Sequence, residues 1–103
     1  MNKTLLGTMR LGAEVLQLVE TSYEDGSPAI EVRDAFGGPY AKLSVNTGRP
    51  LAPRHVAIKN WSENEGLAEA ALATGLFEAT NLEIPTGFAS APVWRIRDEE
   101  VAA

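Results

Sequence analysis

Few side chains in this sequence of 103 residues could carry out catalysis or bind a metal. His55 is the only histidine, so a Ser-His-Asp triad or a histidine metal site would have no second imidazole to support it. The chain has no cysteine, which excludes a disulfide, a thiolate zinc site, an iron–sulfur cluster and a cysteine nucleophile. We therefore predict a structural or solvent-exposed role for His55, and no catalytic residue, metal or cofactor.

Carboxylates are more numerous, with 14 acidic against 9 basic residues and a formal net charge of −5. The runs Glu24-Asp25 and Asp98-Glu99-Glu100 are too short for a calcium-binding loop and lack its spacing. The negative charge disfavours direct contact with a nucleic-acid backbone, which needs clustered lysine and arginine. Solubility explains the acidity, and so does attraction to a basic surface on another protein.

The densest group of polar and aromatic side chains is the stretch Asn60-Trp61-Ser62-Glu63-Asn64-Glu65-Gly66. Ser62 and Glu65 have the spacing of a helix capping box, in which each side chain satisfies a free amide of the first turn. Trp61 is explained either by packing beside the helix start or by an exposed binding anchor. If the acidity serves a partner, the predicted partner-binding residues are Glu24, Asp25, Trp61, Glu63, Glu65 and Glu69.

The capping box predicts a helix over about residues 63–74. At 100° per residue, Leu67, Ala68, Ala71 and Leu72 share one apolar face. Gly75 suits the left-handed position that ends a helix.

Before this helix the chain has the pattern of β-strands. Residues 5–23 predict a short strand and a longer one, although the irregular apolar run in the second also suits a short helix. Residues 29–34 and 40–45 alternate between apolar and polar side chains, and residues 55–59 predict a further strand. Turns fall at residues 24–28 and at Gly37-Gly38-Pro39, which lacks the lysine and serine or threonine of a phosphate-binding loop.

After the helix, residues 76–80 and 82–84 are short extended segments, and residues 93–97 predict a returning strand with Trp94 in the core. The predicted fold is therefore α+β, a single domain over residues 1–103, with a mainly antiparallel meander sheet, one central helix and a short C-terminal hairpin. The helix is expected to cover apolar strand residues, namely Ile30, Val32, Leu43, Val45, Val56 and Ile58. The N-terminus lacks the apolar region of a signal peptide and no run is long enough to cross a membrane, so we expect a cytoplasmic protein.

Several motifs in their order along the chain resemble the uncharacterised family named domain of unknown function 4313. They are the stretch from Lys59 to Leu67, then Ala73-Thr74-Gly75-Leu76, Pro85-Thr86-Gly87-Phe88 and Ala91-Pro92-Val93. The resemblance covers about two thirds of the chain and carries no reaction or catalytic residues. It implies a setting, since members are typical of phages, plasmids and integrated mobile elements.

These observations lead to two main hypotheses. The first is a non-enzymatic accessory protein that binds and inhibits a host defence complex, of the anti-CRISPR or anti-restriction type, by presenting acidic residues to a basic nucleic-acid-binding surface. The second is a small-ligand-binding or regulatory module that acts as a homodimer through an exposed sheet edge. An enzyme that uses carboxylates alone is the third and weakest interpretation.

Overall fold

The computed structural model describes residues 3–49, 51–61, 64–87 and 89–97. Its elements, in chain order, are β1 (Thr4–Leu11), β2 (Glu14–Ser22), β3 (Pro28–Arg33), β4 (Pro39–Lys42), β5 (His55–Ala57), α1 (Glu65–Leu72), β6 (Phe77–Pro85) and β7 (Ser90–Ile96). The α+β prediction is confirmed, because antiparallel strands dominate and one α-helix joins them. Among the described residues, no helix has the length and apolar character needed to cross a membrane.

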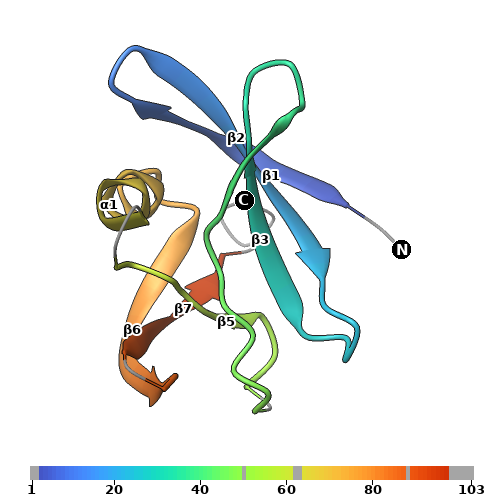
Figure 1. Ribbon diagram of the computed structural model, residues 1–103, viewed down its shortest axis with the longest axis vertical. Helices are drawn as coiled ribbons and strands as arrows, with labels where there is room; N and C mark the ends of the chain where they lie inside the picture. The colour runs from blue at the N-terminus through green and yellow to red at the C-terminus, as the bar shows by residue number, and fades with distance from the viewer. Residues whose placement is uncertain (1–2, 50, 62–63, 88, 98–103) are drawn as a thin grey trace.

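The strands form two sheets (Figure 1). The first is the predicted meander, with strand order β1-β2-β3-β4, and the second has the order β5-β7-β6. β5 pairs with β7 rather than with the meander, and an isolated bridge between Ser44 and Ile58 connects the two parts. The helix α1 packs beside β1 and β6.

The core lies between the two sheets and the buried face of α1. Alternation in the first sheet points Leu16 and Leu18 of β2 and Ile30 and Val32 of β3 inward, and all four side chains are buried. Of the strand residues predicted to lie under the helix, all but Val45 are buried. The helix itself packs mainly against β1 and β6, so the prediction was right about burial but wrong about which strands α1 covers. The other members of the cluster, in chain order, are Met9, Leu43, Val56, Ile58, Leu67, Ala68, Ala71, Phe77, Trp94 and Ile96.

The irregular apolar run in β2 is a strand, as preferred over a helix. Leu16 and Leu18 face the core. Val19 lies on the opposite face and is nevertheless buried, with only 7% of its surface exposed. Burial on both faces explains why the run does not alternate.

Regular pairing of β4 ends at Lys42, earlier than the expected end near residue 45. The reason is Ser44, whose buried hydroxyl accepts a 2.9 Å hydrogen bond from the Ile30 amide and shares a 2.8 Å hydrogen bond with the Tyr23 hydroxyl. Continued alternation would place the Ser44 side chain on the outer, polar face of the strand. In the structure it is turned into the core, where the two hydrogen bonds satisfy its hydroxyl.

The two extended segments expected after the helix form one strand, β6, with an irregularity between Ala79 and Leu82. Asn81 adopts a positive φ of 69°, and the Thr80 hydroxyl donates a 2.6 Å hydrogen bond to the Val93 carbonyl. A bulge of this kind bends the strand without ending it. On β7, Trp94 is buried as predicted and its ring centroid lies 5.4 Å from that of Phe77.

The helix is shorter than predicted, since it begins at Glu65 and ends at Leu72. Asn64 precedes it and makes no side-chain capping hydrogen bond, whereas Ser62, the predicted cap, lies outside the described residues. Leu67, Ala68 and Ala71 are buried as expected, but Leu72 is 37% exposed. Gly75 has the predicted left-handed conformation, with φ at 81°.

Candidate functional site

The turn between β3 and β4 exposes a large aromatic side chain. Phe36 is 99% exposed, the highest value among the large apolar side chains of the described residues. The Asp34 carboxylate fixes the turn, because its Oδ1 accepts hydrogen bonds of 2.9 Å from the amides of both Phe36 and Gly38. Gly37 supplies the positive φ of 87° that the turn needs. Arg33 Nη1 donates a 2.9 Å hydrogen bond to the Gly37 carbonyl and so holds the turn from the strand side. The turn is therefore pre-organised around an exposed phenyl ring.

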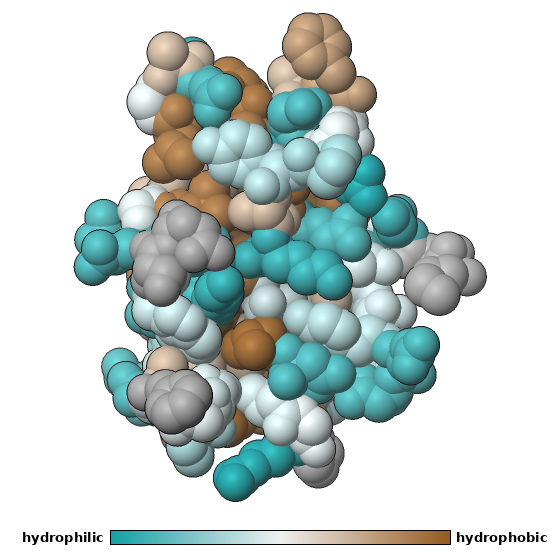
Figure 2. All heavy atoms as spheres, viewed as in Figure 1, coloured by the Kyte–Doolittle hydropathy of each residue, from teal (hydrophilic) through white to brown (hydrophobic). Residues whose placement is uncertain are grey.

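Two further apolar side chains are exposed at the same end of the molecule. Val15, next to the β1–β2 turn, is 41% exposed and Tyr40, next to the β3–β4 turn, is 43% exposed. The Tyr40 hydroxyl donates a 3.2 Å hydrogen bond to Glu14, which links the two hairpins, and the negative charge of Glu14 raises the pKa of Tyr40. We call Val15, Phe36 and Tyr40 the hairpin-end patch. In the space-filling view apolar side chains gather at this end, at the top (Figure 2).

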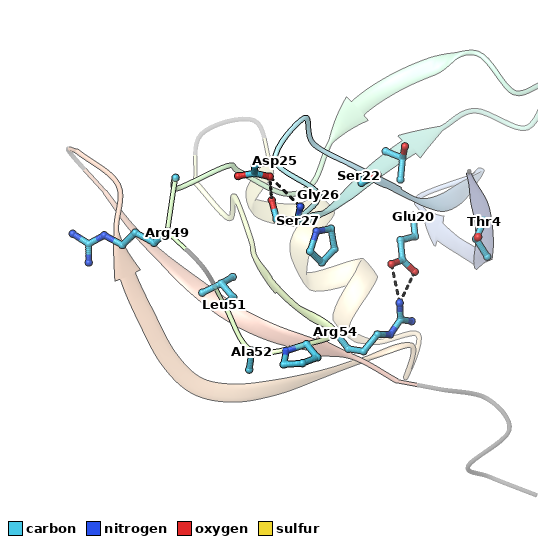
Figure 3. Close-up of a pocket in the computed structure, with 14 residues that line it drawn as sticks. Thr4, Glu20, Ser22, Asp25, Gly26, Ser27, Arg49, Leu51, Ala52 and Arg54 are labelled. Carbon is cyan, nitrogen blue, oxygen red and sulfur yellow. Dashed lines mark hydrogen bonds and ion pairs between the residues drawn. The ribbon is translucent and has the colours of Figure 1, made fainter. Parts of the chain in front are cut away.

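A second feature is a groove between the β2–β3 turn and the loop that precedes β5. Its volume is about 780 Å³. Arg54 Nη1 lies 3.0 and 2.8 Å from the two carboxylate oxygens of Glu20, so one ion pair closes one end (Figure 3). Arg49 extends away from this pair (Figure 3). We call this feature the Glu20–Arg54 groove.

Arg54 has a positive φ of 65°, which is uncommon for a residue with a β-carbon. Its carbonyl accepts a 2.7 Å hydrogen bond from the Ile96 amide, so the second sheet holds this conformation. Glu20 belongs to the first sheet, and the ion pair therefore ties the two sheets together at the groove.

The predicted acidic residues do not form one surface. Glu24 and Asp25 lie in the β2–β3 turn, where Asp25 Oδ1 accepts hydrogen bonds from the Ser27 hydroxyl at 2.6 Å and its amide at 3.0 Å. These bonds lower the pKa of Asp25. Glu65 and Glu69 are exposed on α1, on the other side of the molecule (Figure 1). Glu63 lies outside the described residues.

Trp61 is half-buried, between the two interpretations that the sequence left open. Its carbonyl accepts a 3.1 Å hydrogen bond from the Asn64 amide, which turns the chain into the helix. Asn64 itself is 2% exposed and so belongs to the core rather than to a contact surface.

His55 Nδ1 lies 2.8 Å from the Pro53 carbonyl, a local contact within its own loop. Within the described ranges, no group of three or more histidine, cysteine, aspartate or glutamate side chains is arranged to hold a metal ion.

Sequence reasoning missed Phe36. A signal for it existed, because the segment Asp34-Ala35-Phe36-Gly37-Gly38 places a large aromatic residue inside a turn that is otherwise made of small and polar residues. Apolar residues in turns have no core to enter, and exposure follows. The Glu20–Arg54 pair had no such signal, since the two residues are 34 positions apart.

Comparison of the chain with protein-family models, with curated proteins and with solved structures gave no match. The resemblance to the family of unknown function 4313 therefore stays a prediction.

Proposed function

We propose that the protein acts by binding another protein, with the hairpin-end patch as its contact surface. The observation that supports the proposal is the exposure of Phe36 on a turn fixed by hydrogen bonds. Aromatic side chains dominate the binding energy of many protein interfaces, and a pre-organised turn loses little conformational entropy on binding. Burial of an exposed phenyl ring contributes about 1.5–3 kcal/mol of favourable free energy. Phe36 is not buried in the single chain, so this free energy is available for binding.

The target class rests on the resemblance stated above. A setting in phages and mobile elements favours a host defence complex of the CRISPR or restriction type as the target. Inhibition of such a complex by binding needs no catalytic group. The net charge of −5 and the exposed Glu24, Asp25, Glu65 and Glu69 support attraction to a basic surface. Because these carboxylates lie in two places, each pair would contribute separately to the rate of association.

Two measurements test this function. The first is an interference assay in which host cells with an active defence complex receive phage or plasmid, with and without the protein. We expect protection by the wild-type chain and loss of protection in Phe36→Ser. Leu82→Ser is the matched control, because Leu82 is 60% exposed but lies on β6 of the other sheet.

The second measurement is binding to the purified defence complex. Phe36→Ser should weaken the equilibrium affinity, whereas charge reversal at Glu65 and Glu69 should slow association mainly at low salt. Equal activity of wild-type, Phe36→Ser and Leu82→Ser proteins in both measurements would refute the proposed role of the hairpin-end patch.

The Glu20–Arg54 groove supports a second candidate function, the binding of a small polar ligand. It is large enough for a metabolite, and its lining combines opposite charges with hydroxyl groups such as those of Ser22 and Ser27. A thermal-shift screen of metabolites tests it. A true ligand should stabilise the wild-type protein but not Ala52→Trp, in which an exposed lining position is filled. Stabilisation of both proteins by the same compound would place its binding site elsewhere.

A further inference from the structure

β1 is an edge strand, because the strand order of the first sheet places β2 on one side of it and no strand on the other. A two-residue turn separates β1 from β2, and Leu11 and Glu14 close this turn as a hydrogen-bonded pair. Bonded and non-bonded pairs alternate along an antiparallel ladder, so Met9 bonds to β2 whereas Thr8 and Arg10 do not. The main-chain N–H and C=O groups of Thr8 and Arg10 therefore point out of the sheet.

The pairing on the other side of β2 gives the same alternation. The Leu43 amide donates a 3.0 Å hydrogen bond to the Ile30 carbonyl, so Ile30 bonds towards β4 and its partner Glu20 bonds towards β1. Leu16, the partner of Met9, lies an even number of positions from Glu20 and bonds towards β1 as well. Among the described residues, no main-chain hydrogen bond joins the outward-pointing groups to another segment. They are free to pair with an added strand.

The other edges of the two sheets are covered or bent. The chain after β4 bonds to β5, where the Val45 amide donates a 3.0 Å hydrogen bond to the Ala57 carbonyl. The outer strand of the second sheet, β6, has its irregularity between Ala79 and Leu82, and such a bulge turns an edge away from new partners. In β1 the irregularity precedes the stretch Thr8–Arg10, which is regular. We call this stretch the β1 edge.

A hollow of about 490 Å³ lies beside the β1 edge. Ala70 and Ala73 of α1 form its other wall, next to the hairpin of β1 and β2 (Figure 1). The hollow stays open because alanine side chains are short. Met9 is buried on the core side of β1, whereas Thr8 and Arg10 are exposed on the outer side. A residue placed opposite Met9 on an added strand would point to the same side as Met9, towards the two alanines.

We infer that the β1 edge binds an extended segment of another protein, which adds to the first sheet as an antiparallel strand. The segment's main chain pairs with the outward groups of Thr8 and Arg10, and its residue opposite Met9 places an apolar side chain in the hollow. This combination of main-chain bonds and a side-chain pocket is how exposed sheet edges recognise peptides. Antiparallel pairing is the arrangement of both sheets and the more stable one per residue.

The position of α1 selects a single segment over a second copy of this chain. Two copies paired through β1 about a twofold axis would form one continuous sheet, with the two α1 helices on the same side of it. Because α1 already packs beside β1, the second helix would meet the first. The inference goes beyond the proposed function, since it concerns a surface without Phe36. Val15 borders both the hollow and the hairpin-end patch.

Peptide binding followed by nuclear magnetic resonance tests the inference. The probes are capped heptapeptides with a central alanine, valine, leucine or glycine, two threonines on each side and a lysine at each end. We expect the alanine, valine or leucine peptides to bind with a dissociation constant on the order of 100 μM, and the glycine peptide at least about fivefold more weakly. At saturation the amides of Thr8 and Arg10 should gain protection from hydrogen exchange. The Met9 amide, which already bonds to β2, should not.

N-methylated peptides separate main-chain bonding from side-chain contact. The two residues that flank the central one bond towards β1, so an N-methyl group on either should weaken binding about 10-fold or more. The N–H of the central residue points away from β1. N-methylation there should change the affinity by no more than about twofold.

Variants of the protein test the same contact from the other side. Thr8→Pro removes an outward N–H without breaking the β1–β2 ladder, so it should fold and bind the peptide at least about 10-fold more weakly, whereas Met9→Pro should disrupt β1. Ala73→Trp fills the hollow at an exposed position and should also lose binding. Ala52→Trp, at an exposed position of the Glu20–Arg54 groove, and Phe36→Ser should bind like the wild-type protein. Urea unfolding shows which variants are folded.

Failure of every apolar-centred peptide to bind, or binding that protects neither Thr8 nor Arg10, would overturn the inference. Equal affinities of the N-methylated peptides would overturn the main-chain pairing. Sedimentation velocity tests the choice of occupant, because self-association of the wild-type protein that is lost in Thr8→Pro would assign the β1 edge to a second copy. If Phe36→Ser inhibits the defence complex normally while the peptide results are as expected, the proposed function fails and the inference stands.

Discussion

The side-chain amide of Asn64 donates a 2.7 Å hydrogen bond to the main-chain carbonyl of Lys42. This bond ties the start of α1 to the end of β4, two elements that are 22 positions apart. Asn64 is the residue before the first turn of the helix, where an asparagine side chain ordinarily caps a free amide. Here the side chain serves the contact between the helix and the first sheet instead.

We predict that Asn64→Ala lowers the free energy of unfolding by about 1–3 kcal/mol, because the Lys42 carbonyl loses its buried donor. Asn64→Asp should lower it further, since a carboxylate would face a carbonyl oxygen. Denaturant unfolding measures both. Asn60→Ala, at an exposed position of the same stretch, is the control and should change stability by less than about 0.5 kcal/mol. Equal effects at Asn60 and Asn64 would contradict the role of the bond.

The ion pairs Glu20–Arg54 and Glu78–Arg95 make a matched comparison. Both have a nitrogen–oxygen distance below 3 Å, but the Glu20 side chain is 19% exposed and the Glu78 side chain is 54% exposed. We predict that Glu20→Ala lowers the free energy of unfolding by about 1.5–3 kcal/mol, because it removes charged hydrogen bonds that join the two sheets. Glu78→Ala should lower it by no more than about 1 kcal/mol.

Hydrogen exchange gives a second measurement for Glu20→Ala. The amides of His55 and Ile96 bond to carbonyls of the loop beside the groove, and their protection should fall in this variant. Unchanged protection there, with a loss of stability equal to that of Glu78→Ala, would show that the pair does not hold the loop.

Much of the fold followed from periodicity, as the residues of β3 illustrate. Ile30 and Val32 alternate with Glu31 and Arg33, and this pattern alone gave the buried face correctly. Periodicity gives the face of a strand but not its partner. The pairing of His55 with Arg95 and of Val56 with Trp94 joins segments about 40 positions apart, across the helix, and no local pattern encodes it.

The candidate site was less predictable for the same reason. Phe36 had a local signal in its turn, but its full exposure depends on Asp34 accepting two amides, which fixes the direction of the turn. The Glu20–Arg54 groove combines residues from distant elements, such as Ser27 with Ala52, and no local pattern places these side by side. The acidic residues predicted as one surface are divided because the β2–β3 turn lies at one end of the first sheet, away from α1 (Figure 1).

Two glycines make a matched comparison. A β-carbon at Gly7 would lie 2.8 Å from Leu76 Cδ1, closer than atoms in contact allow, so the side chain of Leu76 must move. Leu76 Cδ1 is the far end of a flexible side chain and can give way at small cost, so we predict that Gly7→Ala changes the free energy of unfolding by less than about 1 kcal/mol. A β-carbon at Gly66 meets nothing within 4 Å.

Gly66 lies within α1, where alanine loses less conformational entropy than glycine, so Gly66→Ala should raise the free energy of unfolding by about 0.5–1 kcal/mol. Denaturant midpoints of the two variants and the wild-type protein provide the measurement. A loss of more than about 1 kcal/mol in Gly7→Ala would mean that the Leu76 side chain cannot give way.

The last prediction concerns stability at acidic pH and rests on Glu31, on the outer face of β3. Burial alone raises the pKa of this carboxyl, but the hydrogen bond from Arg33 and the charges of Lys3, Arg33 and Lys42 outweigh it, so the pKa is lowered overall from its ordinary value of 4.5. Arg33 Nη2 lies 2.8 Å and Lys3 Nζ 3.7 Å from Glu31 Oε1. A lowered pKa in the folded state means that the carboxylate stabilises the fold above its ordinary pKa, and that this stabilisation is lost as the pH falls through the folded-state pKa.

We therefore expect Glu31→Gln to be less stable than the wild-type protein at neutral pH, and the two stability curves to converge as the pH falls below 4.5. Glu69→Gln, at an exposed position on α1, is the control and should follow the wild-type curve throughout. Urea unfolding at a series of pH values measures the three curves, and a constant difference between Glu31→Gln and wild type at every pH would show that the ion cluster does not set the pKa of Glu31.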